Sequence, residues 1–529
     1  MKVLTAAEMR EVDRQTTARY CVSGLALMEN AGGRVVEFLS RRFPEFSQRR
    51  IVVLCGKGNN GGDGFVIARK LRERSAQPAV ILCDAPESVS GDAAVNLNRW
   101  RDAGGAIEKA RLPQEWDAAG KILASAGIII DALLGTGLHG PPEGVYRLAI
   151  EEINRRNPRT IVVATDIPSG LSSDSGGVPG VAVTADYTVT FTAPKFGLVM
   201  YPAAEKVGQL VVADIGSPAQ LVEEIGAGNV RWLEPREFRA LPLRRPADAH
   251  KGDYGHALIV AGSRGKTGAA VLAAWAALRA GAGLVTVATP ATELHTVATP
   301  VPEVMTEPLK ATEAGTASLR SLECGRFADL QKGKMVMAIG PGLSTHQETQ
   351  QFIRKAVEDC PLPMIVDADG LNSFAGRADE LTRRRSPALA LTPHPGEMAR
   401  LLGCATEEVQ GRRLDAARRA ASEWNAIVIL KGHSTVIAAP DGRLWINSTG
   451  NPGMATAGTG DVLTGILAGL VAQFGSEHWL TALEYGVYLH GLAGDIAAAE
   501  LCEASLMASD LIRALPRAFR ETLAEMDRE

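Results

Sequence analysis

Cysteine is scarce in this sequence. Only 7 of its 529 residues are cysteines, and no two follow the C-x-x-C spacing that is typical of zinc sites and redox motifs. This scarcity argues against a small secreted fold stabilised by disulfides, because such domains are dense in cysteine. We therefore expect reduced, buried thiols in a cytoplasmic protein.

Long apolar runs are also missing. A helix needs about 18 to 20 apolar residues to cross a bilayer, and the best candidate, residues 462–474, is shorter and contains Thr464. The first residues lack the apolar segment of a secretory signal, and residues 5–8 instead predict a capping box that opens a helix. We expect no association with membranes.

Neither sign of charge dominates the chain. The 56 lysines and arginines nearly balance the 60 aspartates and glutamates, and the formal net charge is −4. Binding to nucleic acid needs a basic surface, so we expect no nucleic-acid partner. A hydrophobic content of 46% with 22% charged residues is typical of a globular enzyme.

Two stretches of alternating strand and helix patterns predict two α/β domains, residues 1–220 and 221–529. Fully apolar strands separated by helices indicate a parallel sheet that is covered on both faces. The first stretch has predicted strands at 51–55, 79–83, 127–135, 160–168, 186–193 and 209–216. After a predicted linker at 217–252, the second and larger sheet has predicted strands at 256–262, 283–289, 336–342, 364–370, 388–397, 426–432 and 442–447.

A glycine-rich turn follows the first predicted strand. Gly56, Gly58 and Gly61 fit the G-x-G-x-x-G pattern of dinucleotide-binding turns, and Asp84 ends the next strand where that pattern expects an acid. Asp63, however, places a carboxylate where a pyrophosphate would meet backbone N–H groups. Like charges repel at that range unless a cation lies between them.

Polar clusters follow three further strands of the first domain. Because the carboxyl ends of parallel strands form the ligand crevice, we expect these side chains to converge there. The alternative is that they are ordinary turn residues. The candidates are Asn59, Asn60, Asp63, Asp131, Asp166, Ser169 and Lys195.

The sharpest signal of the second domain is a turn with a lone acid. Gly458 and Gly460 permit backbone N–H groups to face an anion, and Asp461 opens the helix that follows. A carboxylate beside an anion hole is what phosphoryl transfer to an alcohol requires. The sequence Gly265-Lys266-Thr267 resembles the end of a P-loop, but Val260 stands where that motif needs glycine, so we interpret it as a loop on the substrate side.

Three motifs of the first domain, GKGNNGGDG, DALLGTGLHG and DIPSG, resemble those of the NAD(P)H-hydrate epimerase family. The resemblance implies a Rossmann-like fold and a potassium ion held by Asn60, Asp131 and Ser169. Asp166 would be the catalytic acid or base, with Lys195 as a weaker candidate. The residues that would contact the hydrated nucleotide are Asn59, Asn60, Gly61, Gly62, Asp63, Gly135, Thr136, Gly137, Leu138, His139, Gly140 and Asp166.

The second domain resembles the ribokinase-like superfamily and, within it, the ADP-dependent NAD(P)H-hydrate dehydratases. The motifs that carry this resemblance are AGAGLVT, GPGL, DADGLN, TPHPGE, KGHST and GMATAGTGDVL. It implies Asp461 as the catalytic base and a role for Glu397 near a Mg²⁺ and phosphate site. Ala270, Gly342, His394 and Asp461 would contact the substrate, and Lys431, Gly432, His433, Ser434, Thr435 and Gly460 would hold ADP.

The two resemblances together imply a repair enzyme for hydrated NADH and NADPH, which works as a homo-oligomer. One domain would interconvert the two epimers at C6, and the other would expel the C6 hydroxyl at the expense of ADP. The residues do not decide between ADP and ATP, between the two routes of epimerisation, or what Asp367 and Asp369 do. Two alternatives stay open: a dinucleotide-binding domain fused to a vitamin-precursor kinase, and a protein-binding role for the first domain.

Overall fold

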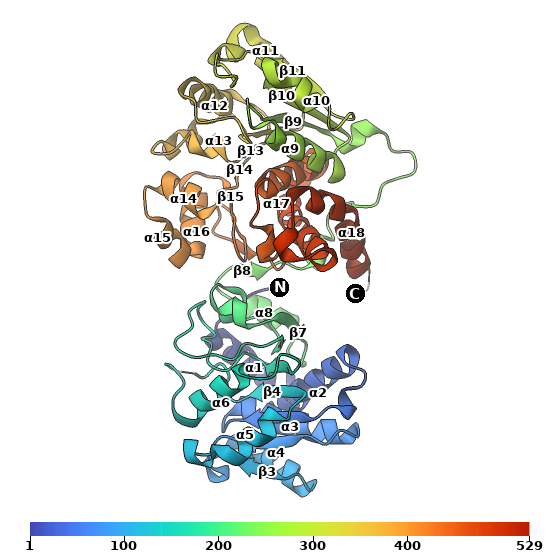
Figure 1. Cartoon of the computed structure of the whole chain (residues 1–529), viewed down its shortest axis with the longest axis vertical. Helices are drawn as coiled ribbons and strands as arrows, with labels where there is room; N and C mark the ends of the chain where they lie inside the picture. Colours follow the sequence, from blue (N-terminus) through green and yellow to red (C-terminus); the bar gives the residue numbers. More distant parts are fainter. Residues whose placement is uncertain (139, 528–529) are drawn as a thin grey trace. The chain divides into compact units, whose positions relative to one another are not determined.

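The computed structural model describes residues 1–138 and 140–527, and the chain forms two compact units. The N-terminal unit runs from Lys2 to Val230, and the C-terminal unit contains Met1 and the chain from Arg231 onward. The units therefore divide after residue 230, whereas the sequence pattern placed the division after residue 220. In each unit, helices cover a central sheet (Figure 1).

The sheet of the N-terminal unit has seven strands in the order β3-β2-β1-β4-β5-β6-β7, and every neighbouring pair is parallel. The strand order reverses between β1 and β4, as in Rossmann-like folds. The strands are β1 Ile51–Cys55, β2 Ala79–Leu82, β3 Ile107–Lys109, β4 Ile128–Ala132, β5 Ile161–Thr165, β6 Tyr187–Phe191 and β7 Gln209–Ala213. The helices are α1 Ala6–Tyr20, α2 Gly24–Arg42, α3 Asn59–Glu73, α4 Gly91–Asp102, α5 Trp116–Ala124, α6 Gly144–Asn154, α7 Phe196–Val199 and α8 Ala219–Ile225.

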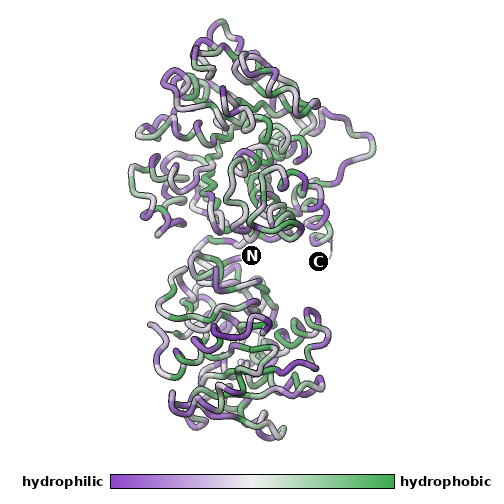
Figure 2. The backbone as a smooth tube through the Cα atoms, viewed as in Figure 1, coloured by the Kyte–Doolittle hydropathy of each residue, from purple (hydrophilic) through white to green (hydrophobic). Residues whose placement is uncertain are grey.

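Both faces of this sheet are buried, as the uniformly apolar strands predict. In β1, Val53 packs with helices α2, α3 and α4, whereas Val52 and Leu54 pack with α5 and α6 on the opposite face. The strands are accordingly the hydrophobic segments of the unit (Figure 2). With both faces covered, the carboxyl edge of the sheet is left for a binding site.

The C-terminal unit has a sheet of ten strands in the order β11-β10-β9-β12-β13-β14-β15-β16-β17-β8. The pairs from β11 to β15 are parallel, while β15-β16 and β16-β17 are antiparallel. Here the order reverses between β9 and β12. The strands are β8 Val230–Trp232, β9 His256–Val260, β10 Leu284–Pro290, β11 Met305–Leu309, β12 Val336–Ile339, β13 Met364–Val366, β14 Leu389–Leu391, β15 Ile427–Leu430, β16 Val436–Ala438 and β17 Leu444–Ile446.

Helices also cover both faces of this second sheet. One apolar cluster joins α9, α17 and α18 to the strands, and α16 packs on β15 and β16. The helices are α9 Thr267–Arg279, α10 Leu294–Ala298, α11 Arg326–Gln331, α12 Gln347–Asp359, α13 Asp369–Asn372, α14 Pro395–Leu402, α15 Thr406–Gly411, α16 Arg413–Glu423, α17 Thr459–Glu500 and α18 Ala508–Met526.

Glycine residues let α17 lie directly on the alanine-rich α9. A Cβ atom at Gly465 would lie 2.1 Å from the carbonyl oxygen of Ala273, and one at Gly469 would lie 2.5 Å from that of Ala277. No side chain fits at such a distance, so the two backbones touch. This contact fixes the start of α17, which carries Asp461, relative to the sheet.

Two sequence expectations are corrected by the fold. The predicted linker at 217–252 contains α8, whose Leu221 and Val222 are buried, and β8, which extends the second sheet. Its many Pro, Arg and Glu residues conceal these short apolar segments. The thiols are free, but only Cys55, Cys83 and Cys360 are buried, whereas the side chains at 21, 324 and 502 are exposed. Within the described residues, no helix is long and apolar enough to cross a membrane.

We predict that Gly465→Ala destabilises the C-terminal unit by about 1 to 3 kcal/mol, because the added methyl group forces α9 and α17 apart. Thermal unfolding of the full chain measures this as a lower midpoint. The matched control is Gly411→Ala in α15, where a Cβ atom meets no described atom within 4 Å. Equal midpoints for the two variants would contradict the close contact.

Candidate active sites

A cleft of about 790 Å³ lies at the carboxyl edge of the N-terminal sheet. It is lined by the segments that follow β1 and β4, the two strands between which the order reverses, which is where open parallel sheets bind ligands. Helix α1 and the loops after β5 and β6 close its other sides. Asp166 and Lys195 from those loops reach into it.

The glycine turn after β1 is held by direct backbone contacts. A Cβ atom at Gly61 would lie 1.9 Å from the carbonyl oxygen of Gly56, and one at Gly56 would lie 2.0 Å from that of Leu133. Only glycine fits at these two positions. The turn therefore packs against the loop after β4, and together they form one wall of the cleft.

A buried group of oxygen atoms lies beneath this wall. Ser169 donates from Oγ to Oδ1 of Asp131 (2.6 Å) and from its backbone N–H to Oδ2 (2.8 Å). Asn60 donates from Nδ2 to the carbonyl oxygen of Leu134 (2.9 Å), which leaves its own Oδ1 buried without a hydrogen-bond partner among the described residues. The structure thus brings Asn60, Asp131 and Ser169 together, as the sequence predicts.

This oxygen group fits a hard cation better than a transition metal. Its donors are an amide oxygen, a carboxylate, a hydroxyl and backbone carbonyls. In the described residues, no group of three or more His, Cys, Asp or Glu side chains could hold a metal ion. The unpartnered oxygen of Asn60 is the atom that a cation such as K⁺ would satisfy.

Asp166 is fixed by an ion pair with a buried lysine. Nζ of Lys195 lies 2.5 Å from Oδ1 of Asp166, and it also donates to Thr190 and to the carbonyl oxygen of Phe191. Lys195 is only 1% exposed. Asp166 itself has a φ of 64°, a strained conformation for a residue with a side chain. This backbone conformation and the lysine together fix the carboxylate at the cleft.

Two further carboxyl groups share this electrostatic environment. Burial, with the nearby charges of Asp166 and Asp13, raises the pKa of Asp63 well above its usual range. Burial also raises the pKa of Asp13 to about 6, although the positive charge of Lys195 opposes the shift. Burial and the neighbouring charges therefore favour the uncharged form of the acid in the glycine turn, which weakens the repulsion that a charged Asp63 would exert on an anion.

The predicted residues of this site occupy different depths. Asn59, Asn60, Asp63, Gly135, Thr136, Gly137 and Leu138 line the cleft. Gly61 and Gly62 lie behind it and are buried, Gly140 lines a separate hollow, and His139 lies outside the described residues. Asp84 is engaged by Lys57 and Tyr146.

Sequence reasoning missed the contribution of α1, which brings Met9, Arg10, Asp13, Arg14 and Thr17 to the cleft. A signal was present. The buried positions of α1 include Met9, Val12 and Thr16, so Asp13 is an acid beside the apolar face of the helix. Such a position is unfavourable for a charged group unless it serves a site.

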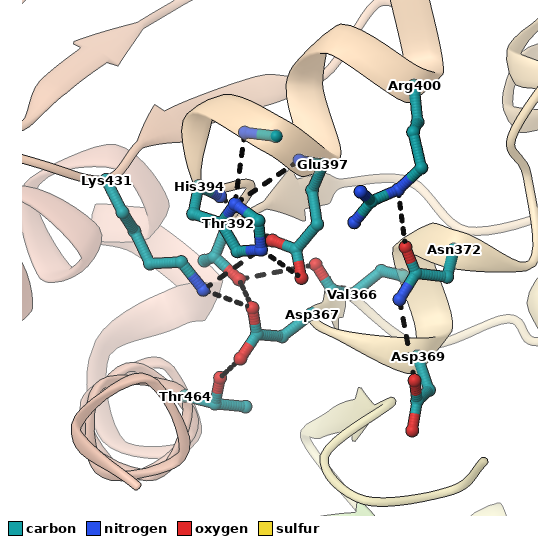
Figure 3. A network of polar contacts seen from close by, with 11 residues as sticks. Val366, Asp367, Asp369, Asn372, Thr392, His394, Glu397, Arg400, Lys431 and Thr464 are labelled. Carbon is teal, nitrogen blue, oxygen red and sulfur yellow. Dashed lines mark hydrogen bonds and ion pairs between the residues drawn. The ribbon is translucent and has the colours of Figure 1, made fainter. Parts of the chain in front are cut away.

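The second site lies at the carboxyl edge of the C-terminal sheet, where a buried aspartate joins two loops and helix α17 (Figure 3). Oδ1 of Asp367, after β13, accepts hydrogen bonds from Lys431 (2.7 Å) and Thr392 (2.7 Å). Its Oδ2 accepts one from Thr464 of α17 (2.7 Å). Burial alone would lower the pKa of Lys431, but the negative Asp367 and Glu397 reverse the shift and raise it. Lys431 therefore stays charged.

Asp461 lies in the first turn of α17, after Gly458, whose φ of 92° favours glycine. A Cβ atom at Gly460 would lie 3.4 Å from Nζ of Lys431 and 3.9 Å from Oδ2 of Asp367, so the helix start lies directly against that ion pair. Burial and the charge of Asp367 raise the pKa of Asp461 to about 7, against the attraction of Lys431. A carboxyl group that titrates near neutrality can both accept and return a proton.

His394 caps helix α14. Its Nδ1 accepts hydrogen bonds from the backbone N–H groups of Gly396 (3.1 Å) and Glu397 (3.3 Å), and Glu397 in turn accepts one from the backbone N–H of His394 (2.9 Å). Burial, Lys431 and Arg400 lower the pKa of His394, so its ring is neutral. Because Nδ1 accepts hydrogen bonds, the ring proton lies on Nε2, which is 3.4 Å from Oε1 of Glu397. His394 thus has a local structural role, while its ring stays half exposed.

Asp369 connects the loops after β9 and β12 by accepting a hydrogen bond from each. Its Oδ2 accepts from Nζ of Lys266 (3.1 Å) and from the backbone N–H of Ser344 (2.8 Å). A Cβ atom at Gly342 would lie 2.7 Å from the carbonyl oxygen of Lys266, so the two loops touch. Ala270, in α9 behind them, is fully buried.

The segment from Lys431 to Thr435 turns sharply after β15. Gly432 has a φ of 136° and Ser434 a φ of 50°, and Thr435 donates a hydrogen bond to the carbonyl oxygen of Gly432 (3.1 Å). Beneath the turn, the buried guanidinium of Arg413 donates to the carbonyl oxygens of Leu430 (3.0 Å) and Lys431 (3.3 Å). Oγ of Ser434 lies 3.1 Å from Nδ1 of His433. The predicted nucleotide loop therefore lies beside Gly460.

The structure adds supporting residues that sequence reasoning missed here. His490, far along α17, lies with Nε2 2.9 Å from the carbonyl oxygen of Thr459, and burial lowers its pKa to about 4, so it is neutral. It anchors the turn that carries Asp461. Thr464 supports Asp367, and Arg413 supports the turn that begins at Lys431. In the sequence, their only signal was a position within or beside an apolar helix face.

Each half of the chain matches a known protein family, and relatives match the chain over its full length. Residues 257–517 match the family model described as NAD(P)H-hydrate dehydratase, and residues 24–197 match that of the YjeF-related protein N-terminus. A bifunctional NAD(P)H-hydrate repair enzyme of Moorella thermoacetica is 45% identical over 530 residues, which covers 100% of this chain and 98% of that protein. The protein of the same description from Escherichia coli is 35% identical and covers 97% of this chain and 93% of its own length.

The chain belongs to the family of bifunctional NAD(P)H-hydrate repair enzymes. The resemblance noted in the sequence is thereby confirmed, and so is the fold class, with a Rossmann-like N-terminal and a ribokinase-like C-terminal α/β unit. An ADP/ATP-dependent NAD(P)H-hydrate dehydratase of Bacillus subtilis, co-crystallised with ATP and Mg²⁺, is 33% identical. It covers 56% of this chain and 100% of its own, with a TM-score of 0.48.

In this NAD(P)H-hydrate repair family member, we predict that Asp367→Asn destabilises the C-terminal unit by about 3 kcal/mol, because the partly buried Lys431 is left beside a neutral group. Calorimetry of the full chain measures the shift. The control is Asp441→Asn, which breaks an exposed ion pair with Arg443 and should cost less than about 1 kcal/mol. Similar losses for the two variants would show that the buried pair does not support the site.

Proposed function

We propose that the protein repairs hydrated NADH and NADPH with two active sites, one in each unit. The N-terminal unit interconverts the R and S epimers at C6 of the nicotinamide ring. The C-terminal unit dehydrates the S epimer and consumes ADP, which yields AMP and phosphate. The observation that carries the proposal is the pair of separate carboxylate–lysine clusters, each at the carboxyl edge of its own sheet.

The chemistry of dehydration explains why a kinase-like site is useful. Hydroxide is a poor leaving group, and in this unit conversion of the C6 hydroxyl to a phosphate ester provides a better one. Asp461, with its pKa near 7, accepts the hydroxyl proton while the oxygen attacks the β-phosphoryl group of ADP. The lone pair of the ring nitrogen then expels phosphate to give an iminium ion. Loss of a proton from C5 restores the dihydronicotinamide.

The nucleotide site combines the turn from Lys431 to Thr435 with Gly460. Lys431 is charged and lies beside Gly460, so it is placed to stabilise the transferring phosphoryl group. Mg²⁺ usually keeps several water ligands and needs only one or two carboxylates besides the phosphates. Glu397 is the carboxylate that fits this need, because the oxygens of Asp367 are already engaged. Substrate contacts would come from Gly342, His394 and Asp461, with Ala270 shaping the loop behind them.

Epimerisation by loss and return of the C6 hydroxyl requires proton transfer to and from its oxygen. Asp166 is the group that the N-terminal cleft offers for this transfer. Its ion pair with Lys195 keeps it oriented. Asn60, Asp131 and Ser169 would hold K⁺, which supplies positive charge beside the phosphates of the substrate. Asn59, Asp63 and residues 135–138 would contact the nucleotide.

The alternative of a dinucleotide-binding domain fused to a vitamin-precursor kinase is less favoured, because relatives that match the full chain share one repair description. A protein-binding role for the N-terminal unit is disfavoured by its strained and ion-paired Asp166. The substrates are small molecules. A homo-oligomeric state and a cytoplasmic location stay predictions, which sedimentation and cell fractionation would test.

The test supplies a mixture of both epimers of hydrated NADH with Mg²⁺, K⁺ and ADP, and follows the near-ultraviolet absorbance of the dihydronicotinamide. We predict full recovery by the unaltered protein. Asp461→Asn should lower dehydration at least about 100-fold, because the base is lost, while the epimers still interconvert. Asp166→Ala should recover only the S portion. The proposal fails if the unaltered protein recovers nothing with either ADP or ATP.

Removal of potassium gives a separate prediction for the N-terminal site. Exchange of K⁺ for the larger tetramethylammonium ion should slow epimerisation about tenfold or more, because the oxygen group around Asn60 then lacks its cation. Dehydration of the purified S epimer serves as the internal control and should not change. A rate of epimer interconversion that is independent of K⁺ would reject the cation site while leaving the cleft assignment intact.

A further inference from the structure

Asp13 places a carboxyl group in the N-terminal cleft, and no hydrogen bond of its buried oxygen explains a structural role for it. It projects from α1 and lines the cleft with Asp63, Asp166 and Lys195, which come from three other segments of the unit. Its Oδ1 is buried and has no hydrogen-bond partner among the described residues. A structural carboxylate normally accepts several hydrogen bonds, because an unpaired buried charge is costly.

The environment of Asp13 is the opposite of that of Asp166. Asp166 accepts a hydrogen bond from the ammonium group of Lys195 and forms an ion pair with it. Asp13 lacks such a donor on its buried oxygen, and its raised pKa keeps a larger share of the group protonated. One carboxyl group paired with a cation and a second one without a donor are an arrangement suited to a base and an acid in one site.

Inversion at a single carbon needs such a pair. A stereocentre that loses a group from one face and regains it on the other requires a proton donor on the first side and a proton acceptor on the second. Asp13 comes from the helix that closes the cleft, and Asp166 comes from the sheet edge. The two groups therefore approach the same space from different structural elements.

We propose that Asp13 is the second catalytic residue of the epimerase and acts as the proton donor that complements Asp166. This inference rests on the proposed epimerase function. Arg10 and Arg14, on the same helix, also line the cleft and would face the anionic part of the substrate rather than its ring.

The step is balanced without any co-reactant other than water. Asp13 gives its proton to the C6 hydroxyl of one epimer, the C6–O bond breaks, and water leaves as the lone pair of the ring nitrogen forms a C6=N iminium bond. Water then adds to the opposite face of C6. Asp166 removes a proton from this water as the new C–O bond forms and the electron pair returns to nitrogen. The reverse conversion uses the two groups in exchanged roles.

The experiment measures epimer interconversion by the full-length protein without ADP, so that dehydration does not occur, in water enriched in oxygen-18. We predict that Asp13→Asn lowers kcat about 100-fold with KM changed less than about threefold, because the variant keeps the shape of the side chain and loses the proton. Asp13→Glu should restore part of the rate. The unaltered protein should place one solvent oxygen at C6 per inversion.

The matched control is Asp117→Asn on the exposed side of α5, which should leave the rate unchanged. Thermal unfolding checks that each variant is folded, and if Asp13→Asn is not, Asp13→Glu and the isotope result still decide. The inference is overturned if Asp13→Asn has a normal kcat, if it changes only KM, or if no solvent oxygen enters. If the unaltered protein does not interconvert the epimers at all, the proposed epimerase function fails instead.

Discussion

Each unit of this protein depends on a buried lysine–aspartate pair at the carboxyl edge of its sheet. Lys195 holds Asp166 in the N-terminal unit, and Lys431 is held by Asp367 in the C-terminal unit. The pairs have opposite uses. In the first, the aspartate faces the cleft and the lysine is hidden, whereas in the second the aspartate is hidden and serves to keep the lysine charged. A buried pair tolerates the loss of neither member, since the remaining charge would lie unpaired in the interior.

The charged pairs also determine the protonation of the acids beside them. In the C-terminal unit, burial and the negative charge of Asp367 together raise the pKa of Asp461 to about 7. In the N-terminal unit, Asp166 is engaged, and its charge adds to the burial that raises the pKa of Asp63 and Asp13. In both units, lysine fixes one carboxyl group in an ion pair, and the pKa of a neighbouring acid is raised. Acid–base chemistry at neutral pH requires that combination.

Topology explains why these groups meet. The strand order reverses next to β1 in the N-terminal sheet and next to β9 in the C-terminal sheet, and the loops on either side of such a point diverge to leave a crevice. Close backbone contacts then fix the loops, as at Gly56 and Gly61 in one unit and at Gly342 and Gly465 in the other. The same architectural solution thus supports two different reactions on one metabolite, which is consistent with a repair enzyme that must process both epimers.

The sequence by itself determined the α/β class, the position of most strands, and the motif residues Asn60, Asp131, Asp166 and Asp461, because apolar strands and glycine turns are local signals. Lys431 was implied only by the resemblance of its motif to a known family. The sequence pattern did not predict β8, because its three residues lie in a polar stretch. Only the tertiary structure decided that Asp367 is the hub of its site and that Asp13 belongs to the epimerase cleft. Their roles arise from burial and from groups distant in the chain, such as the hydrogen-bond donor Thr464 for Asp367 and the charge of Asp166 for Asp13. Burial and distant contacts set the charge of a carboxyl group, and neither can be read from its sequence neighbours.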